Sequence, residues 1–142
     1  LRFLITGVCN AHCPHCHNEG VRTRVAYMPF EIVTRVIDVV EKSAAPVKSA
    51  TVSGGEALLH PQVYDIVKAL TRVSSKLTLS TNGFRLSREV ASSLVDHGVT
   101  KFRIDVDPYR LEGPHWNSAG ADQARSLSPF FRHNRRPLPL RP

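Results

Sequence analysis

The sequence predicts an α/β fold built around a parallel sheet. Its 142 residues suffice for one domain, and short strand-like segments alternate along the chain with amphipathic helical segments. This alternation favours parallel strands joined by right-handed helical crossovers. Within the strand segments apolar and polar residues also alternate, so we expect helices to cover one face of the sheet. The other face either meets solvent or lines the lumen of a barrel, and the alternation alone leaves both open.

The boundaries of the expected elements follow from turn and capping residues. The strands are expected over residues 2–6, 49–53, 76–81 and 100–107. Pro29 and Pro61 suit the first turns of two helices, and Ser87 is the expected N-cap of a third helix that ends at Gly98. Four strands therefore alternate with three helices.

The composition indicates a soluble globular protein. With 42% hydrophobic and 22% charged residues it is neither disordered throughout, nor collagen-like, nor a membrane bundle. No apolar stretch approaches the roughly 20 residues of a membrane-spanning helix, and the first residues lack the features of a signal peptide. We expect a cytoplasmic protein that does not bind membranes. Because a strand-like segment begins at once after Leu1, we also expect that the chain is truncated.

The last quarter of the chain differs from the rest. From Pro108 onward it holds six of the ten prolines and six arginines against Glu112 and Asp122, a balance of +4 out of the total +7. We predict a core over residues 1–107 and an irregular, disordered Pro/Arg-rich tail over 108–142. Since the basic charge is concentrated in the tail and no recognition helix accompanies it, we do not expect nucleic acid as the partner.

Three cysteines follow the first strand with the spacing Cys-x3-Cys-x2-Cys. They are Cys9, Cys13 and Cys16. An odd number of closely spaced thiols does not suit a disulfide framework, whereas thiolates select zinc, copper(I) or an iron–sulfur cluster. A cubane cluster normally takes four cysteines, so three would leave one iron open to a small molecule. The alternative is a structural zinc site completed by a histidine. The candidate histidines are His12, His15 and His17.

Two further polar loops follow the second and third strands. In Gly54-Gly55-Glu56, paired glycines let backbone approach a ligand closely, and the carboxylate suits an ammonium group. Thr81-Asn82-Gly83 ends the third strand. Because ligands bind at the carboxyl ends of parallel strands, we expect all three loops to form one site.

With these three motifs the sequence resembles the radical S-adenosylmethionine (SAM) superfamily. The three cysteines match its cluster loop, Gly54–Glu56 its glycine motif, and Thr81–Gly83 a recurrent ending of the third strand. The resemblance covers residues 1 to about 107. The opening residues also look like the branch of the molybdenum-cofactor cyclase and its peptide-modifying relatives. The fold that this resemblance implies is a partial (β/α) barrel, of which about four βα units are readable here.

The resemblance also implies a set of site residues. Cys9, Cys13 and Cys16 would ligate three irons of a [4Fe-4S] cluster, and SAM would chelate the fourth iron. The glycine motif would line the methionine part of SAM, with Glu56 receiving its ammonium group. Further contacts to the carboxylate or ribose of SAM are expected from Ser80, Asn82 and Asp105. The implied protein is an enzyme: an electron donor such as flavodoxin or ferredoxin reduces the cluster, SAM is cleaved, and the 5′-deoxyadenosyl radical abstracts hydrogen from an unknown substrate.

Two features depart from the family's pattern. His15 precedes the third cysteine, where an aromatic hydrophobic residue is usual, although an imidazole can still stack. The family's core also has more βα units than the four readable here, so the sheet would keep an unpaired edge. Two alternatives follow: a non-catalytic zinc-binding module with a basic interaction tail, and an inactive fragment of a radical SAM enzyme.

Overall fold

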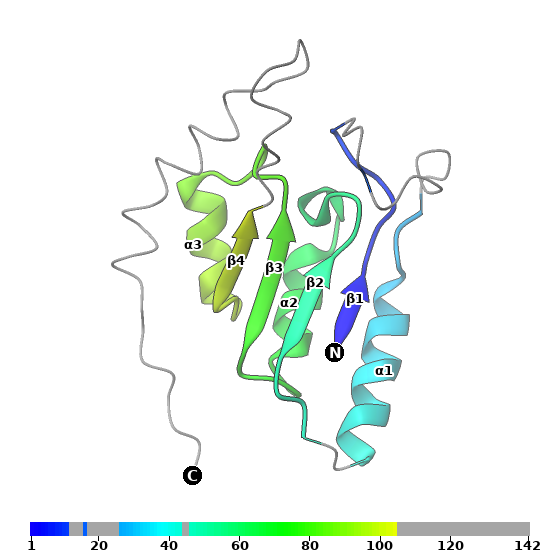
Figure 1. Ribbon diagram of the computed structural model, residues 1–142. Coiled ribbons are helices and arrows are strands. Elements are labelled where there is room, and N and C mark those ends of the chain that lie inside the picture. Colours follow the sequence, from blue (N-terminus) through cyan, green and yellow to red (C-terminus); the bar gives the residue numbers. More distant parts are fainter. Residues whose placement is uncertain (12–15, 17–25, 44–45, 105–142) are drawn as a thin grey trace.

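The computed structural model describes residues 1–11, 16, 26–43 and 46–104 and contains one four-stranded sheet. All neighbouring strands pair in parallel, in the order β1-β2-β3-β4. The strands are β1 (Arg2–Leu4), β2 (Ala50–Ser53), β3 (Leu77–Thr81) and β4 (Lys101–Ile104). They alternate with α1 (Phe30–Lys42), α2 (Val63–Leu70) and α3 (Arg88–Asp96), and a 3₁₀ helix, η2 (Ala57–Leu59), follows β2. The predicted α/β class and parallel sheet are confirmed (Figure 1).

The helices bury one face of the sheet. Phe3, Val52 and Leu79 are register partners across β1, β2 and β3, and all three are buried. In the hydrophobic core these strand residues pack with buried residues of the three helices. The helix residues are Val33, Ile37, Ile66, Val67, Leu70, Ala91 and Leu94. Because burying a large aliphatic or aromatic side chain stabilises by about 1.5–3 kcal/mol, this layer holds the sheet and helices together.

The opposite face of the sheet carries polar residues, as the alternation within the strands predicts. Arg2, Thr51, Thr78 and Lys101 form one row across the four strands, and Ser80 pairs with Arg103 in the next row. Thr51, Thr78 and Ser80 are half-buried, and both basic residues of β4 are exposed. Asp105 and Asp107, which the alternation also places on this face, lie outside the described residues.

Local hydrogen bonds explain where the elements depart from the predicted bounds. Strand β1 ends at Leu4 rather than at residue 6; beyond it Ile5 still donates its N–H to Ser53 O at 2.9 Å, and Thr6 forms an antiparallel bridge with Tyr27. The second helix begins at Val63 rather than Pro61. There the N–H of Gln62, which has no helical carbonyl to bond to at this end, donates to Nδ1 of His60 at 3.1 Å.

Helix α1 buries only part of its apolar surface. Val33 and Ile37 are fully buried, whereas Ile32 and Val39 of the same helix are 46% and 66% exposed. Residues 33 and 37 are about one turn apart and point inward, whereas 32 and 39 are turned about 100° or more away from them around the helix.

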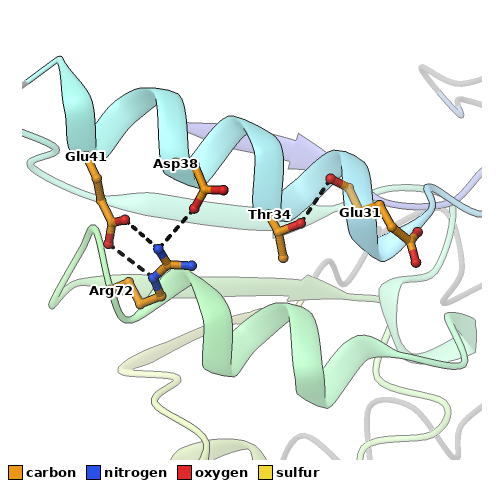
Figure 2. Close-up of polar contacts among 5 residues, drawn as sticks. All are labelled: Glu31, Thr34, Asp38, Glu41 and Arg72. Atoms are coloured by element: carbon orange, nitrogen blue, oxygen red, sulfur yellow. Dashed lines mark hydrogen bonds and ion pairs between the residues drawn. The ribbon is translucent and has the colours of Figure 1, made fainter.

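An exposed ion cluster joins α1 to the turn after α2 (Figure 2). The Arg72 guanidinium donates to Asp38 at 3.0 Å and to both carboxylate oxygens of Glu41. The two acids raise the pKa of Arg72 through these hydrogen bonds, Glu41 first. Because all three side chains are well solvated, we expect this cluster to contribute little to stability.

Within the described part of the chain, none of the helices combines the length and apolar composition that crossing a membrane requires. The predicted Pro/Arg-rich tail over 108–142 lies outside the described residues, so the boundary at residue 107 stays a prediction.

Candidate functional site

The loop that carries the cysteines is closed at its base. Gly7 donates its N–H to the carbonyl of Ala26 at 3.0 Å, and the Thr6 hydroxyl donates to the same carbonyl at 3.0 Å. That hydroxyl also accepts the N–H of Val8 at 3.0 Å. Together with the Thr6–Tyr27 bridge, these bonds fix the start of the loop just past the carboxyl end of β1.

The glycine pair lies against this loop. Gly55 donates its N–H to Thr6 O and Glu56 donates its N–H to Val8 O, each at 2.8 Å. A Cβ atom on Gly54 would lie 2.4 Å from Thr6 O, and one on Gly55 would lie 2.4 Å from Val8 O. The sequence predicts that the paired glycines let a ligand approach the backbone closely. In the structure it is the protein's own cysteine loop that approaches them. Both glycines are needed for the loop to pack there.

The carboxylate of Glu56 connects the loops after β2 and β3. Its Oε1 accepts the Leu58 N–H at 2.9 Å and the Thr81 hydroxyl at 2.8 Å, and its Oε2 accepts the Asn82 N–H at 2.7 Å. The first of these bonds caps η2. Glu56 is fully buried, and the three donors offset the desolvation of its charge.

The third loop reaches back to the cysteines. The amide oxygen of Asn82 accepts the Phe84 N–H at 3.1 Å. Its Nδ2 donates to Asn10 Oδ1 at 2.8 Å and lies 3.8 Å from the Cys9 sulfur. The turn is completed by Gly83, whose φ of 84° falls in the left-handed region. The loops after β1, β2 and β3 thus meet at one edge of the sheet, as predicted.

Cys9 and Cys16 are half-buried. The Ala11 N–H donates to the Cys9 sulfur at 3.4 Å. Cys13 lies outside the described residues, as do His12, His15 and His17, the candidate fourth ligands of the zinc alternative. Within the described residues alone, no three metal-binding side chains of the types His, Cys, Asp or Glu gather at one point.

Ser80 takes no part in the hydrogen bonds described for this network. Ser80 lies on the open face of the sheet, opposite Arg103 in the register of β3 and β4. Asp105 lies outside the described residues. The structure therefore brings together Cys9, Gly54, Gly55, Glu56 and Asn82, while Ser80 borders them on the open face.

Two residues of the network have no role predicted from the sequence. Asn10 accepts the Asn82 amide, as described above. His60 is buried, with Nε2 3.0 Å from the carbonyl of Met28 and its ring edge-on to Tyr27. Because its Nδ1 accepts an N–H, Nε2 carries the proton and donates to Met28. The sequence signals neither contact, since both join segments far apart in the chain.

The sequence matches the profile of the family described as the radical SAM superfamily over residues 3–112. It is 32% identical over 114 residues to GTP 3′,8-cyclase of Microcystis aeruginosa, covering 75% of this chain and 34% of that protein. It is 29% identical over 109 residues to AdoMet-dependent heme synthase of Methanosarcina barkeri, covering 76% of this chain and 31% of that protein. The chain thus spans about a third of the length of these curated relatives.

A solved structure shares the fold. The crystal structure of BtrN in complex with AdoMet and 2-DOIA superposes with a TM-score of 0.68 at 19% sequence identity. The match covers 86% of this chain and 50% of the BtrN chain. At this identity the likeness concerns the fold, which agrees with the parallel βα arrangement in Figure 1.

Proposed function

Because the chain belongs to the radical SAM superfamily, we propose that it holds a [4Fe-4S] cluster and binds SAM at the edge where its three motif loops meet. The observation that carries this proposal is the continuous hydrogen-bonded path from the Cys9 sulfur through Asn82 to the buried Glu56. It joins all three motifs of the family in one place.

The described residues fit such a group. Cys9 lies past the carboxyl end of β1, and the backbone N–H of Ala11 and the side-chain amide of Asn82 lie within hydrogen-bonding distance of its sulfur. Donors to sulfur stabilise a thiolate, which is the form that binds metal. Cys9, Cys13 and Cys16 would hold the cluster, and when bound it supplies the one-electron cleavage of SAM to a 5′-deoxyadenosyl radical.

The residues of the other two loops would bind and orient SAM. Gly54, Gly55 and Glu56 line the methionine part in this proposal, with the Glu56 carboxylate receiving the ammonium group. Ser80, Asn82 and Asp105 are proposed to contact its carboxylate or ribose. The open face of the sheet, where Ser80 and Arg103 lie, is the surface on which the substrate would bind.

The reaction is proposed only as far as hydrogen abstraction. The relatives bear the names of enzymes with different reactions, so their names do not narrow the substrate of this chain. A low-potential electron donor of the flavodoxin or ferredoxin class would reduce the cluster. We place this chemistry in the cytoplasm, where thiols stay reduced.

The test is electron paramagnetic resonance of the anaerobically reconstituted, dithionite-reduced chain, with and without SAM. We expect a reduced-cluster signal that changes when SAM is added. A cluster signal indifferent to SAM contradicts SAM binding and marks an inactive fragment. Stoichiometric zinc without iron or acid-labile sulfide contradicts the cluster and indicates the zinc-binding module instead.

A matched pair of variants makes this test specific. Cys9→Ser removes one proposed ligand and should lower the iron content and abolish the reduced-cluster signal. The control is Ser75→Ala. Ser75 is exposed before β3, at the end of that strand opposite to Asn82, so this variant should retain the iron content and the reduced-cluster signal. Equal iron content in the two variants would remove Cys9 from the proposed ligand set.

A further inference from the structure

The Cys9 sulfur receives a contact from a distant part of the chain. Nδ2 of Asn82, 73 residues away, lies 3.8 Å from Sγ, within the longer range of hydrogen bonds to sulfur. The nearby Ala11 N–H lies 3.4 Å from the same atom. Asn82 is buried, so water does not compete strongly for its amide. The amide is thus a candidate donor to Cys9 itself.

The orientation of this amide follows from its other bonds. Oδ1 accepts the Phe84 N–H at 3.1 Å, which a nitrogen in that position could not do. The backbone N–H of Asn82 is fixed to Oε2 of the buried Glu56. Nδ2 must therefore face the cysteine loop. It has two hydrogens, and its two partners there are Asn10 Oδ1 and Cys9 Sγ.

We propose that Asn82 is a positioning residue that donates a hydrogen bond to the cluster-ligating sulfur of Cys9 and thereby raises the reduction potential of the cluster. This inference rests on the proposed function. With the cluster held by Cys9, Cys13 and Cys16, an electron supplied by the low-potential donor would add negative charge to the coordinating sulfurs. A hydrogen bond to one of them stabilises the reduced form more than the oxidised form. No bond breaks at Asn82, and its amide keeps both protons.

This role differs from the contact to SAM expected from the sequence. Because Asn10 and Cys9 take both hydrogens of Nδ2, a SAM carboxylate would have to displace one of them. If SAM displaces Asn10, the bond from Asn82 to Cys9 remains, so Asn82 still influences SAM cleavage through the cluster potential.

The test is an EPR-monitored redox titration of the reconstituted chain. Asn82→Ser retains a hydroxyl that can accept the Phe84 N–H, yet its side chain is too short to reach Cys9. We expect the one-electron reduction constant to fall about threefold to tenfold, and tenfold corresponds to 59 mV. Asn82→Asp keeps the shape and the acceptor but places an anionic oxygen beside the sulfur, so its potential should fall further.

Asn10→Ala is the matched control. It removes Asn10 Oδ1, the other acceptor of the Asn82 amide, and leaves the hydrogen bond from Asn82 to Cys9. The reduction potential of the cluster should therefore not fall. If both Asn82 variants titrate at the wild-type potential, or if Asn10→Ala lowers it as much as Asn82→Ser, the inference is wrong. In that case a wild-type cluster that responds to SAM still supports the proposed function. A wild-type chain that assembles no cluster overturns both.

Discussion

The Glu56 carboxylate accepts the backbone N–H of Asn82 at 2.7 Å, and this buried bond joins the loop after β2 to the loop after β3. The same carboxylate accepts the Thr81 hydroxyl and the Leu58 N–H. Glu56 therefore holds the loops after β2 and β3 together. Receiving an ammonium group, as proposed, would be a second role of the same carboxylate.

Glu56→Gln is expected to destabilise the fold by about 1–3 kcal/mol. The amide has one oxygen where the carboxylate has two, so one buried donor from Leu58, Thr81 or Asn82 must face an NH₂ group. Urea unfolding followed by circular dichroism measures the change. Glu31→Gln is the matched control because Glu31 is exposed on α1, and it should change the free energy of unfolding by less than about 0.5 kcal/mol. Equal effects of the two substitutions would contradict the supporting role of Glu56.

His60→Phe should loosen the point at which the cysteine loop returns to the core. Phenylalanine keeps the ring packing against Tyr27 but loses the bonds to Met28 O and Gln62 N. We expect faster hydrogen exchange at the Met28 amide, which is bonded to Ile5 O at 2.7 Å. His97→Phe is the control, since its ring hydrogen-bonds to Ser93 O at the end of α3 and packs against Tyr64 of α2. It should leave exchange at Met28 unchanged, and equal acceleration in both variants would contradict the local role of His60.

Glu89 should make the stability of the chain depend on acid pH. Its own backbone N–H, followed by the Ser87 hydroxyl, lowers the pKa of this carboxyl from the ordinary 4.5 at the start of α3. A lowered folded-state pKa means stability that is present above the unfolded value and is lost as pH falls through the folded value. The difference in free energy of unfolding between wild type and Glu89→Gln should therefore be larger at pH 7 than at pH 3. A difference that stays constant between these pH values would rule this linkage out.

The sequence predicts the elements and the meeting of the loops because both depend on local patterns. Alternation within β3, the Ser87 cap and the glycine after α3 are read from neighbouring residues, and parallel pairing brings the strand ends to one edge. The family motifs add the identity of the site.

The contacts inside the site could not be predicted in the same way. Asn82 reaches Cys9 across 73 residues, and His60 reaches Met28 across 32, so no local pattern carries them. The sequence shows that Glu56 is a carboxylate at a strand end, but its burial depends on Thr81 and Asn82 folding over it. Burial of a charge follows from tertiary packing, which a single sequence does not display.

Comparing Gly55→Ala with Gly98→Ala should distinguish a disturbed cysteine loop from a general loss of stability. Its Cβ would meet two backbone oxygens, Val8 O at 2.4 Å and Gly7 O at 2.8 Å, so the loop itself must shift. We expect a loss of stability of about 1–3 kcal/mol and a lower iron content after reconstitution. Gly98→Ala is the comparison: it is strained by its φ of 114° and by the Thr71 methyl group, yet lies at the end of α3. It should also lower stability but bind iron as wild type does. If Gly55→Ala bound iron normally, contact between the glycine motif and the cysteine loop would not be required for cluster assembly.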